Sequence, residues 1–474
     1  MPKLLIFLLI AIYIYSLASA ISVLLLENRN AVKSLSWILV MIFLPYLGLF
    51  FYLVLGQNYR KQKLISKKSI RRITDRPGNK FNIDPLSTNR IFKNYYQLIQ
   101  LLFKNGESAA YSNNKIEVLA EGFSTFDAMF DAISSAKEHI HIEFFIFEDD
   151  LISNKLRELL ISKAKQGVRV RMIYDFLGSW VLSKKYLHTL EKAGVYARPF
   201  LPFKLRLGRS KINFRNHRKL LVVDGKIGFT GGLNVADRYV YGNTLGIWRD
   251  TFVKFEGAAV HGLQQMFLID WYFVEGKLIT DLKYFPQPEE YNENLVQIVS
   301  SGPDTDWESI MQGICFAIMT SKKYVYIHSP YFVPTDAILN AMQVASLSGV
   351  DIRLMLPEKS DSRLSDYCTS SYIQQVLDAG IKVYRYNKGF LHSKAIVIDD
   401  FISIVGSANM DERSFTSNFE MNAFIYEKGT AIHLKELFFN DLKNCYELNS
   451  EQWSNRTKGQ KLKESSARLF SPLV

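Results

Sequence analysis

Two histidines in this chain have the same chemically useful neighbours at the same spacings. Each copy reads His-x-Lys, four residues, Asp, and then a glycine-containing element that ends in Asn: His217, Lys219, Asp224 and Gly231–Asn234 in the first copy, and His392, Lys394, Asp399 and Gly406–Asn409 in the second. One His-x-Lys alone is weak evidence, because a histidine two residues from a lysine on a strand is usually a surface pair. Two copies with one spacing indicate a duplicated module that builds a single site from two halves.

These residue types suit phosphoryl transfer through a covalent intermediate. A neutral histidine can attack phosphorus and a protonated one can donate to the departing oxygen, so two histidines supply both roles. Cationic and amide or hydroxyl donors stabilise charge on the non-bridging oxygens, and the candidates are Lys219, Lys394, Asn234, Ser407 and Asn409. The sequence has no cluster of Asp, Glu or His with metal-ligand spacing. We therefore expect the lysines to do what a metal does elsewhere, with no metal and no cofactor.

The segment after each His-x-Lys predicts a strand hairpin. An Asp-Gly pair between two apolar strands is a strong signal for a two-residue turn. A turn at Asp224-Gly225 pairs His217 with Gly232, and glycine at that position leaves room for a ligand near the backbone. The second copy follows the same pattern, with its turn, histidine and facing residue at Asp399-Asp400, His392 and Ser407.

Acidic residues have two possible places in such a site. Asp224 and Asp399 lie at the predicted hairpin tips, where Asp more often serves turn geometry than proton transfer, so a scaffold role and a catalytic role both stay open for them. Asp250 and Glu420 follow the histidine of their own copy, and each opens a strand that would lie beside that hairpin. An acid on one imidazole nitrogen fixes the tautomer of the other. Each is therefore predicted to orient the histidine of its own copy, with an ordinary surface acid as the alternative.

Other landmarks repeat together with the motifs. Residues 137–147 resemble residues 322–332, and the landmarks of the two copies recur at a near-constant separation along the chain. Each copy reads strand, helix, strand, helix, strand hairpin, which predicts α/β domains with largely parallel strands. The predicted domains are 111–275 and 297–474, joined by a connector over 276–296.

The first 56 residues differ from the rest in being strongly apolar, with two long runs at about 4–26 and 35–55. Crossing ~30 Å of hydrocarbon takes ~20 helical residues, so the two runs predict a transmembrane helical hairpin. A cleaved signal peptide is the alternative for the first run, because residues 16–20 resemble a cleavage site. The following segment, 57–110, is a basic stretch and a linker. Its Lys and Arg residues between 60 and 72, without an acid among them, place the body in the cytoplasm by the positive-inside rule.

The charge distribution favours a lipid partner over a nucleic acid. The formal net charge is +12, and a basic surplus indicates anionic partners. Between residues 201 and 220, basic and apolar side chains are interleaved without an acid, as an anionic membrane surface would favour. A flexible solvated loop is the alternative for this segment. Three scattered cysteines fit a reducing compartment.

The paired motifs identify a family by resemblance. The duplicated H-x-K-x4-D with its Gly-x-x-Asn element resembles the phospholipase D superfamily and, within it, the bacterial cardiolipin synthases. The stretches that carry the likeness are the two apolar N-terminal runs, Asn216–Asn234, Gly406–Phe415 and Ala467–Val474. The resemblance covers essentially the whole chain. It implies an α/β fold of two tandem phospholipase D-like domains that share one active site behind a transmembrane hairpin.

The resemblance also implies a reaction and its residues. A phosphatidyl group would pass from one phosphatidylglycerol to a hydroxyl of another, giving cardiolipin and glycerol in the plasma membrane. By analogy His217 is the nucleophile and His392 the acid that protonates glycerol and then the base, and the His, Lys and Asp of both motifs are carried over as catalytic. Gly232 replaces the Ser of many superfamily members, present here as Ser407, so the halves are inequivalent. The alternatives are a membrane-anchored hydrolase that uses water and a non-enzymatic scaffold, against which the complete motifs count.

Overall fold

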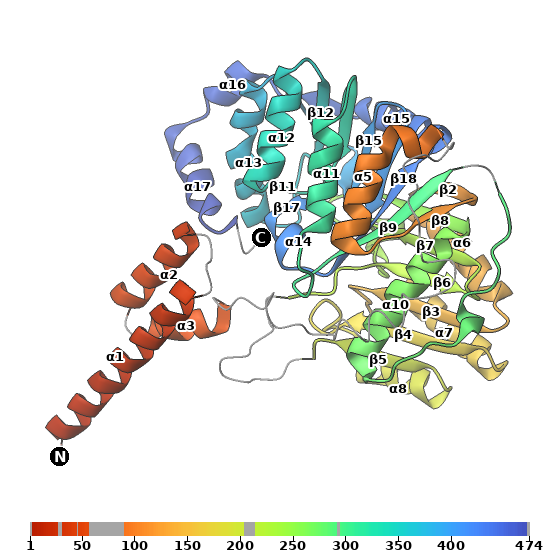
Figure 1. The fold of residues 1–474 in the computed structure, drawn as a ribbon, viewed down its shortest axis with the longest axis horizontal. Helices are drawn as coiled ribbons and strands as arrows, with labels where there is room; N and C mark the ends of the chain where they lie inside the picture. Colours follow the sequence, from red (N-terminus) through yellow and green to blue (C-terminus); the bar gives the residue numbers. More distant parts are fainter. Residues whose placement is uncertain are drawn as a thin grey trace. The chain divides into compact units, whose positions relative to one another are not determined.

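The computed structural model describes residues 2–26, 31–44, 46–55, 90–202, 214–291 and 294–471. The chain divides into two compact units, one formed by residues 1–62 and 202–214 and the other by residues 63–201 and 215–474. Each unit is considered by itself (Figure 1). The basic run after residue 60, the linker up to residue 89 and most of the basic-apolar segment, 203–213, lie outside the described residues.

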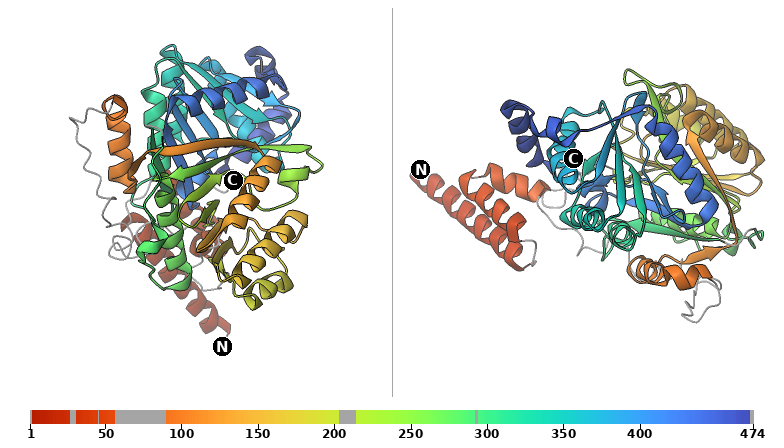
Figure 2. Two further views of the ribbon diagram at one scale, coloured as in Figure 1. Left: turned by 90° about the vertical axis from the view of Figure 1, so that its right-hand side faces the viewer. Right: turned by 90° about the horizontal axis from the view of Figure 1, so that it is seen from above.

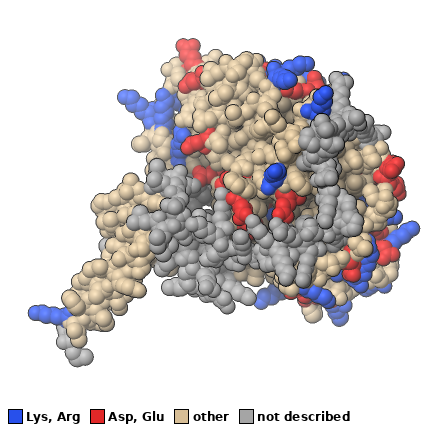
Figure 3. Space-filling model, viewed as in Figure 1, with Lys and Arg blue, Asp and Glu red and all other residues tan. Residues whose placement is uncertain are grey.

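The smaller unit contains a helix that can cross a membrane. α1 (Pro2–Leu26) is a continuous helix, and its segment Lys3–Ser22 is long and apolar enough to span, with only 6% of the span buried. Figure 3 shows the surface of the N-terminal helices almost free of charge apart from the chain's first residues. An apolar helix that stays exposed in a protein fold is stable when lipid covers it.

The second apolar run is not the single helix that its composition predicts. It forms α2 (Ala31–Phe43) and α3 (Leu47–Leu55), and Tyr46 between them has a φ of 61°. Position 45 is a proline, and proline has no N–H with which a helix could continue to the carbonyl of Met41. Tyr13 of α1 instead donates its hydroxyl to that carbonyl at 2.5 Å. Among the described residues, α1 is therefore the one helix that meets the criteria for a span.

The larger unit holds two α/β halves, one for each copy of the motif (Figures 1 and 2). The sheet of the first half runs in the order β14 (Gly389–Leu391), β8 (Ile247–Gly257), β7 (Ile227–Gly231), β6 (Leu220–Val223), β3 (His139–Phe144), β4 (Arg169–Asp175) and β5 (Tyr196–Phe200), with β2 (Asn114–Glu121) also paired to β8. Its helices are α6 (Gly122–Ser135), α7 (Leu151–Lys165), α8 (Lys184–Lys192), α9 (Arg238–Tyr241) and α10 (Ala259–Glu275).

The second half repeats this plan. Its sheet runs β1 (Ala110–Ser112), β9 (Leu295–Ser301), β18 (Glu420–Tyr426), β16 (Ile402–Gly406), β15 (Ala395–Ile398), β10 (Tyr324–His328), β12 (Asp351–Pro357), β13 (Lys382–Tyr386) and β19 (Cys445–Glu447), beside the small pair β11 (Phe332–Val333) and β17 (Met410–Asp411). Its helices are α11 (Ser309–Met319), α12 (Asp336–Leu347), α13 (Arg363–Asp378), α14 (Glu412–Thr416), α15 (Lys428–Leu442), α16 (Ser450–Ser454) and α17 (Lys458–Arg468). A 3-10 turn, η1 (Leu282–Tyr284), lies in the connector.

Strand directions in both sheets are more mixed than the sequence predicts. β3, β4 and β5 are parallel, because helices α7 and α8 connect them. The hairpin strands β6 and β7 and the neighbouring β8 run antiparallel, because their connections are short or reverse the chain directly. The same division holds in the second half, where β10, β12 and β13 are parallel and β15, β16 and β18 are antiparallel.

The two halves exchange segments. α5 (Arg90–Gly106), which the sequence assigns to the linker, is a helix that packs on β9 and α11 of the second half. β1 pairs with β9, although it precedes the first half in the chain. In return β14, which precedes the second motif, adds to the edge of the first sheet by pairing with β8. These exchanges bring the segment before His392 against the strand that contains Asp250.

Candidate active site

The two motif histidines open onto one cavity in the larger unit. His217 lies in the segment before β6 and His392 in the segment before β15, and both line a cavity of about 600 Å³. Asn234 and Asn409, the last residues of the two glycine-containing elements, line the same cavity. The structure thus brings together both halves of the pattern found in the sequence.

Each histidine is held by an acid from the opposite half. His217 Nδ1 lies 2.9 and 3.1 Å from the two carboxylate oxygens of Glu420, and His392 Nδ1 lies 2.6 Å from Asp250 Oδ2. The prediction that each acid orients the histidine of its own copy is therefore wrong in its pairing. With Nδ1–H donated to the acid, Nε2 of each ring is left unprotonated for chemistry.

Backbone hydrogen bonds across the halves cause this crossing. His217 N donates to the carbonyl of Phe419 at 2.9 Å, and His392 N donates to the carbonyl of Arg249 at 2.8 Å. Each histidine is thus fastened to the residue that precedes the acid of the other half. Because Phe419 and Arg249 directly precede Glu420 and Asp250, each carboxylate lies beside the histidine that is bonded to its neighbour.

The motif lysines are buried next to the histidines. Lys219 Nζ donates to the carbonyl of His217 at 2.6 Å, and Lys394 Nζ donates to that of His392 at 2.5 Å. Burial lowers the pKa of Lys394 to about 8, against the opposing pull of Asp250 and Glu420. Burial also lowers the pKa of Lys219 well below its usual value. Neither lysine lines the cavity itself, but each lies two residues from a histidine that does. A bound anion would favour the charged form of both ammonium groups.

The electrostatics of the two acid–histidine pairs differ. Burial raises the pKa of Asp250 to about 6, with Lys394 partly opposing this. Burial acts on Glu420 in the same direction, but His217, Lys219 and a hydrogen bond from Ser407 hold the pKa of Glu420 below its usual value. Burial lowers the pKa of His217 to about 4, and burial together with Lys394 lowers that of His392. Both histidines are therefore neutral at neutral pH.

Gly232 and Ser407 occupy equivalent positions in the two halves, and each lies against the acid that holds a histidine. A Cβ on Gly232 would lie 2.2 Å from Asp250 Oδ1, so glycine makes room for the carboxylate rather than for a ligand. This corrects the expectation that Gly232 faces His217. In the second half Ser407 Oγ donates to Glu420 Oε2. The carboxylate of Asp250 thus packs directly against Gly232, whereas the carboxylate of Glu420 accepts a hydrogen bond from the Ser407 hydroxyl.

The hairpin register explains why Gly232 does not face His217. Asp224 and Gly225 have φ of 52° and 66°, and Lys226 N donates to the carbonyl of Val223 at 3.0 Å. The turn therefore forms where predicted, but strand pairing resumes between Val223 and Ile227, one residue later than a two-residue turn would give. The second copy shows the same shift, with Ile398 paired to Ile402.

The structure places Asp224 and Asp399 at the hairpin tips, at the far end of β6 and β15 from the histidines. The carboxylate of Asp224 accepts from the backbone N–H groups of residues 137, 138 and 139, each at 2.8 Å. Asp399 accepts from those of residues 322, 323 and 324 at 2.6 to 3.0 Å. Each aspartate therefore ties its hairpin to the start of β3 or β10.

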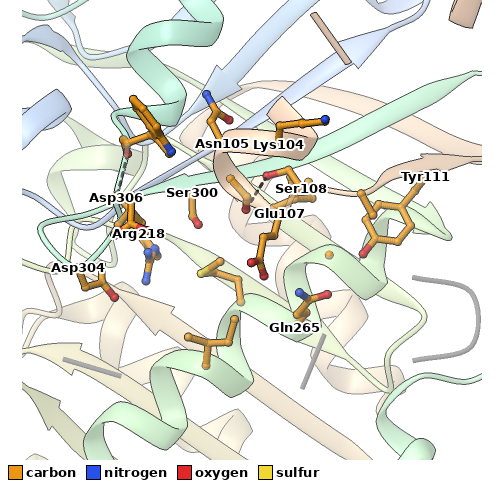
Figure 4. Close-up of a pocket in the computed structure, with 18 residues that line it drawn as sticks. Lys104, Asn105, Glu107, Ser108, Tyr111, Arg218, Gln265, Ser300, Asp304 and Asp306 are labelled. Carbon is orange, nitrogen blue, oxygen red and sulfur yellow. Dashed lines mark hydrogen bonds between the residues drawn. The ribbon is translucent and has the colours of Figure 1, made fainter. Parts of the chain in front are cut away.

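A buried arginine behind the first motif is a feature that sequence reasoning missed. Arg218, counted in the sequence among loop charges, is buried and binds both carboxylate oxygens of Asp270 on α10 at 2.5 and 2.6 Å. Its Nε also donates to the carbonyl of Glu420 at 3.3 Å. Because side chains alternate along an extended segment, Arg218 points to the side opposite His217 and Lys219. It there borders a second cavity, of about 290 Å³, between α10 and β9 (Figure 4).

In the second half, the arginine that pairs with a buried helix aspartate comes from the first half. Position 393, which corresponds to Arg218, is a serine. Asp441 of α15 is instead bound by Arg249 of β8, with Nη2 3.0 Å from Oδ2, and His328 Nε2 lies 3.4 Å from the same oxygen. No local pattern could have revealed this pair, because its members are separated by 192 residues.

The remaining lining of the active-site cavity is rich in arginine. Arg215, Arg238 and Arg413 line it, together with the carboxylates of Asp361 and Asp411. Arg215 belongs to the basic segment predicted to face lipid, but it is buried and lies 4.0 Å from Asp175. Across the described ranges, no three His, Cys, Asp or Glu side chains gather as possible metal ligands.

Comparison with known protein families gives two matches. Residues 129–267 and 314–442 match the family described as "Cardiolipin synthase, PLD-like domain", and residues 11–57 match "Phospholipase_D-nuclease N-terminal". The chain is 41% identical to the cardiolipin synthase of Geobacillus sp. (strain WCH70), over 95% of this chain and 90% of that one. It is 37% identical to cardiolipin synthase 2 of Staphylococcus epidermidis over 98% of both chains.

A solved structure shares the fold. The phosphatidylserine synthase of Haemophilus influenzae Rd KW20 superposes with a TM-score of 0.61, covering 80% of this chain and 100% of that chain at 14% sequence identity. At this identity the likeness concerns the fold alone.

Proposed function

This chain belongs to the family of cardiolipin synthases with phospholipase D-like domains, and we propose that it joins two phosphatidylglycerol molecules through a phosphatidyl-histidine formed on His217. It is thus a phosphatidyltransferase that acts on phospholipids. The observation that carries the mechanism is the crossed pair of acid-held histidines on one cavity.

In the first step His217 Nε2 attacks the phosphorus of one phosphatidylglycerol. The P–N bond forms, the P–O bond to the glycerol headgroup breaks, and His392 supplies the proton that the glycerol oxygen takes. Negative charge on the bound phosphodiester raises the pKa of His392, which lets this ring carry the proton. Lys219 and Lys394 stabilise the charge on the non-bridging oxygens.

In the second step His392 takes the proton of a glycerol hydroxyl on a second phosphatidylglycerol. The oxygen attacks the same phosphorus, the P–N bond to His217 breaks, and cardiolipin leaves with both phosphates. The balance over both steps is two phosphatidylglycerols in, cardiolipin and glycerol out. An ionised Glu420 supports His217 as the nucleophile, because it stabilises the positive charge that the ring carries while phosphorylated.

The arginine-rich lining favours a lipid acceptor over water. The acceptor phosphatidylglycerol brings a second phosphodiester, close to the reacting hydroxyl on the same glycerol. Arg215 and Arg413 line the cavity and are the groups we assign to that phosphate, with Asp361 assigned to the glycerol hydroxyls. A hydrolase that admits water would have no use for a second anion site. Asn234, Ser407 and Asn409 complete the donor set, while Asp224 and Asp399 act as scaffold.

We place the catalytic body on the cytoplasmic side of the plasma membrane, with α1 and the α2–α3 segment as two membrane-embedded elements. The basic residues between 60 and 72 support this orientation. Cysteine-reactive reagents that do not cross membranes should reach a cysteine introduced at Ser450, an α16 position, only after the cells are opened. Labelling in intact cells would contradict the assignment.

The reaction is tested with the full chain in vesicles of labelled phosphatidylglycerol. Cardiolipin and glycerol in equal amounts are the expected products. Phosphatidic acid as the sole product would mean that water is the acceptor, and no product would favour the scaffold alternative.

The roles of the histidines are tested by trapping the labelled adduct with a denaturing detergent at mildly alkaline pH, where a P–N bond to histidine is stable. His217→Ala should abolish the adduct, and His392→Ala should let it form slowly and persist, because the second step needs His392 as base. An adduct that survives only in His217→Ala would reverse the two roles.

A further inference from the structure

We propose that the loop Phe176–Leu182, beside the active site, enters the membrane interface and brings the cavity to its lipid substrates. The proposal rests on the proposed function only in that the substrates are bilayer phospholipids. The loop connects β4 to α8 within the larger unit. The partner assigned to it is the polar–apolar boundary of an anionic phospholipid leaflet.

The tip of the loop is apolar and exposed. Trp180 is 78% exposed and Val181 50%, and Phe176 and Leu177 beside them are also exposed. Tryptophan with aliphatic neighbours is the composition that membrane interfaces favour, since the indole has an apolar body and a polar N–H. Four such residues in one short loop therefore indicate a surface with a partner.

Charges next to the tip match an anionic leaflet. Lys184 and Lys185, both exposed, open α8 directly after the loop. Lysines close to an anionic leaflet are attracted to its surface charge. Asp149 also lies here, where it accepts a hydrogen bond from Ser183 Oγ at 2.5 Å. An apolar tip with cations behind it matches the layers of a bilayer, in which the apolar interior lies beneath anionic headgroups. Binding to a protein partner would not require this arrangement.

Trp307 shows how a similar exposed residue differs in its surroundings. It is 55% exposed, in the loop after β9, but Asp304, Asp306 and Glu308 lie close to it in the chain. These acids would repel an anionic leaflet. Trp307 is therefore the matched control for Trp180.

The loop is held firmly, so its tip projects in one direction. Asp175 Oδ1 accepts from the backbone N–H groups of Leu177 and Gly178 at 3.0 and 2.8 Å. Ser179 Oγ donates to the carbonyl of Phe145 at 3.1 Å and accepts from Phe147 N at 3.0 Å. Because these hydrogen bonds already fix the backbone of the loop, its apolar tip loses little conformational entropy on insertion.

The same contacts connect the loop to the active site. Gly178 packs so closely on Phe145 that a Cβ would lie 2.4 Å from its carbonyl oxygen. Phe145 lines the active-site cavity, and its ring lies edge-on to His217 with 5.0 Å between centroids. Asp175, the base of the loop, also accepts from Asn216 N at 2.9 Å. One side chain thus separates the loop from the proposed nucleophile, which places the cavity at the depth of phospholipid headgroups.

Tryptophan quenching tests whether the loop is in the bilayer. The full chain, Trp180→Phe and Trp307→Phe are each reconstituted in phosphatidylglycerol vesicles whose acyl chains carry bromine near the headgroup. The emission that Trp180→Phe removes should be strongly quenched by bromine, and that removed by Trp307→Phe should respond only to aqueous acrylamide. Quenching of Trp180 by acrylamide alone overturns the proposal. So does protection from both quenchers, because a protein surface would then cover the loop.

Turnover gives a second test. Trp180→Ser with Val181→Ser should lower cardiolipin formation from vesicles about tenfold, the equivalent of one well-buried side chain. The same variant should lose little activity on short-chain phosphatidylglycerol dispersed in water, and Trp307→Ser should behave as the native chain on both. Equal losses on both substrates would mean damage to the site and overturn the proposal. The quenching experiment can also be done with His217→Ala, because it does not depend on turnover. The membrane position of the loop can therefore be determined even if the proposed reaction is wrong.

Discussion

The two histidines are alike in their motifs and unlike in what holds them. His217 is paired with a glutamate that also accepts from Ser407 and, at 3.2 Å, from Asn418 Nδ2. His392 is paired with Asp250, whose other oxygen accepts from Thr251 N at 2.7 Å. More donors keep a carboxylate ionised. Glu420 is therefore held in its ionised form beside His217, the ring that we propose as the nucleophile.

The crossed pairing predicts which step each acid serves. Glu420→Gln should slow formation of the adduct, and Asp250→Asn should slow its transfer to the acceptor, each by about 10²-fold or more, as expected for a lost orienting acid. Rapid mixing followed by a quench in denaturing detergent at mildly alkaline pH, where the P–N bond is stable, separates the two rates. Glu158→Gln, an exposed acid on α7, serves as control. If Asp250→Asn alone stopped adduct formation, His392 rather than His217 would be the nucleophile.

The buried lysines predict a falling rate in alkaline solution. Burial lowers the pKa of Lys394 to about 8, so its cation is present below that pH and is lost as the pH rises through it. Burial lowers the pKa of His217 to about 4, so the neutral nucleophile is available throughout the range above. Turnover should therefore decline as the pH rises through the pKa of Lys394.

Lys394→Arg should move that decline to higher pH, because arginine keeps its charge, even if the maximal rate falls. Lys461→Arg, on α17, should leave the profile unchanged. A decline at the same pH in Lys394→Arg would show that another group titrates. The measurement is the pH dependence of kcat/KM for short-chain phosphatidylglycerol.

Among the secondary-structure elements, the motif hairpins position the site from both ends. The histidine end of each hairpin is fastened to the opposite half, and the aspartate tip is fastened to its own half through three backbone N–H groups. The left-handed φ is 52° at Asp224 and 53° at Asp399. Aspartate tolerates this region better than most residues. The aspartate of each motif thus fixes the hairpin tip against the first residues of β3 or β10.

Asp224→Ala should lower the stability of the fold and leave the catalytic rate nearly unchanged. Loss of a charged acceptor for three backbone donors should lower the free energy of unfolding by about 2–3 kcal/mol, with kcat within about threefold at low temperature. Asp281→Ala, an exposed acid, is the control. Denaturant unfolding and turnover of the same samples measure both. Native stability with abolished turnover would instead make Asp224 catalytic.

Across the whole larger unit, the two halves complete each other. Each supplies the acid for the other's histidine, the first half supplies Arg249 for Asp441, and the second supplies β14 to the first sheet. A half by itself would therefore leave buried charges unpaired, which is costly. Each copy of the motif is thus completed by residues of the other half.

Arg249→Met should destabilise the joint between the halves. It removes the cation from a buried pair and leaves Asp441 with His328, a loss of about 3–5 kcal/mol. Lys254→Met on the same strand removes only two surface ion pairs, with Glu117 and Glu256. Such a pair is worth about 1 kcal/mol or less. Hydrogen exchange at β8 and α15 should rise in the first variant and not in the second. Equal effects would show that the crossed pair does not hold the halves together.

Local spacing and periodicity were enough to predict the duplicated motif, the α/β order of each half and the apolar N-terminus. They could not predict which acid meets which histidine, since the partners are separated by 203 and 142 residues. They also could not show that Gly232 makes room for Asp250 or that Arg249 serves the second half. Either pairing is compatible with the motif, and backbone hydrogen bonds that form only when the halves pack together select one of them.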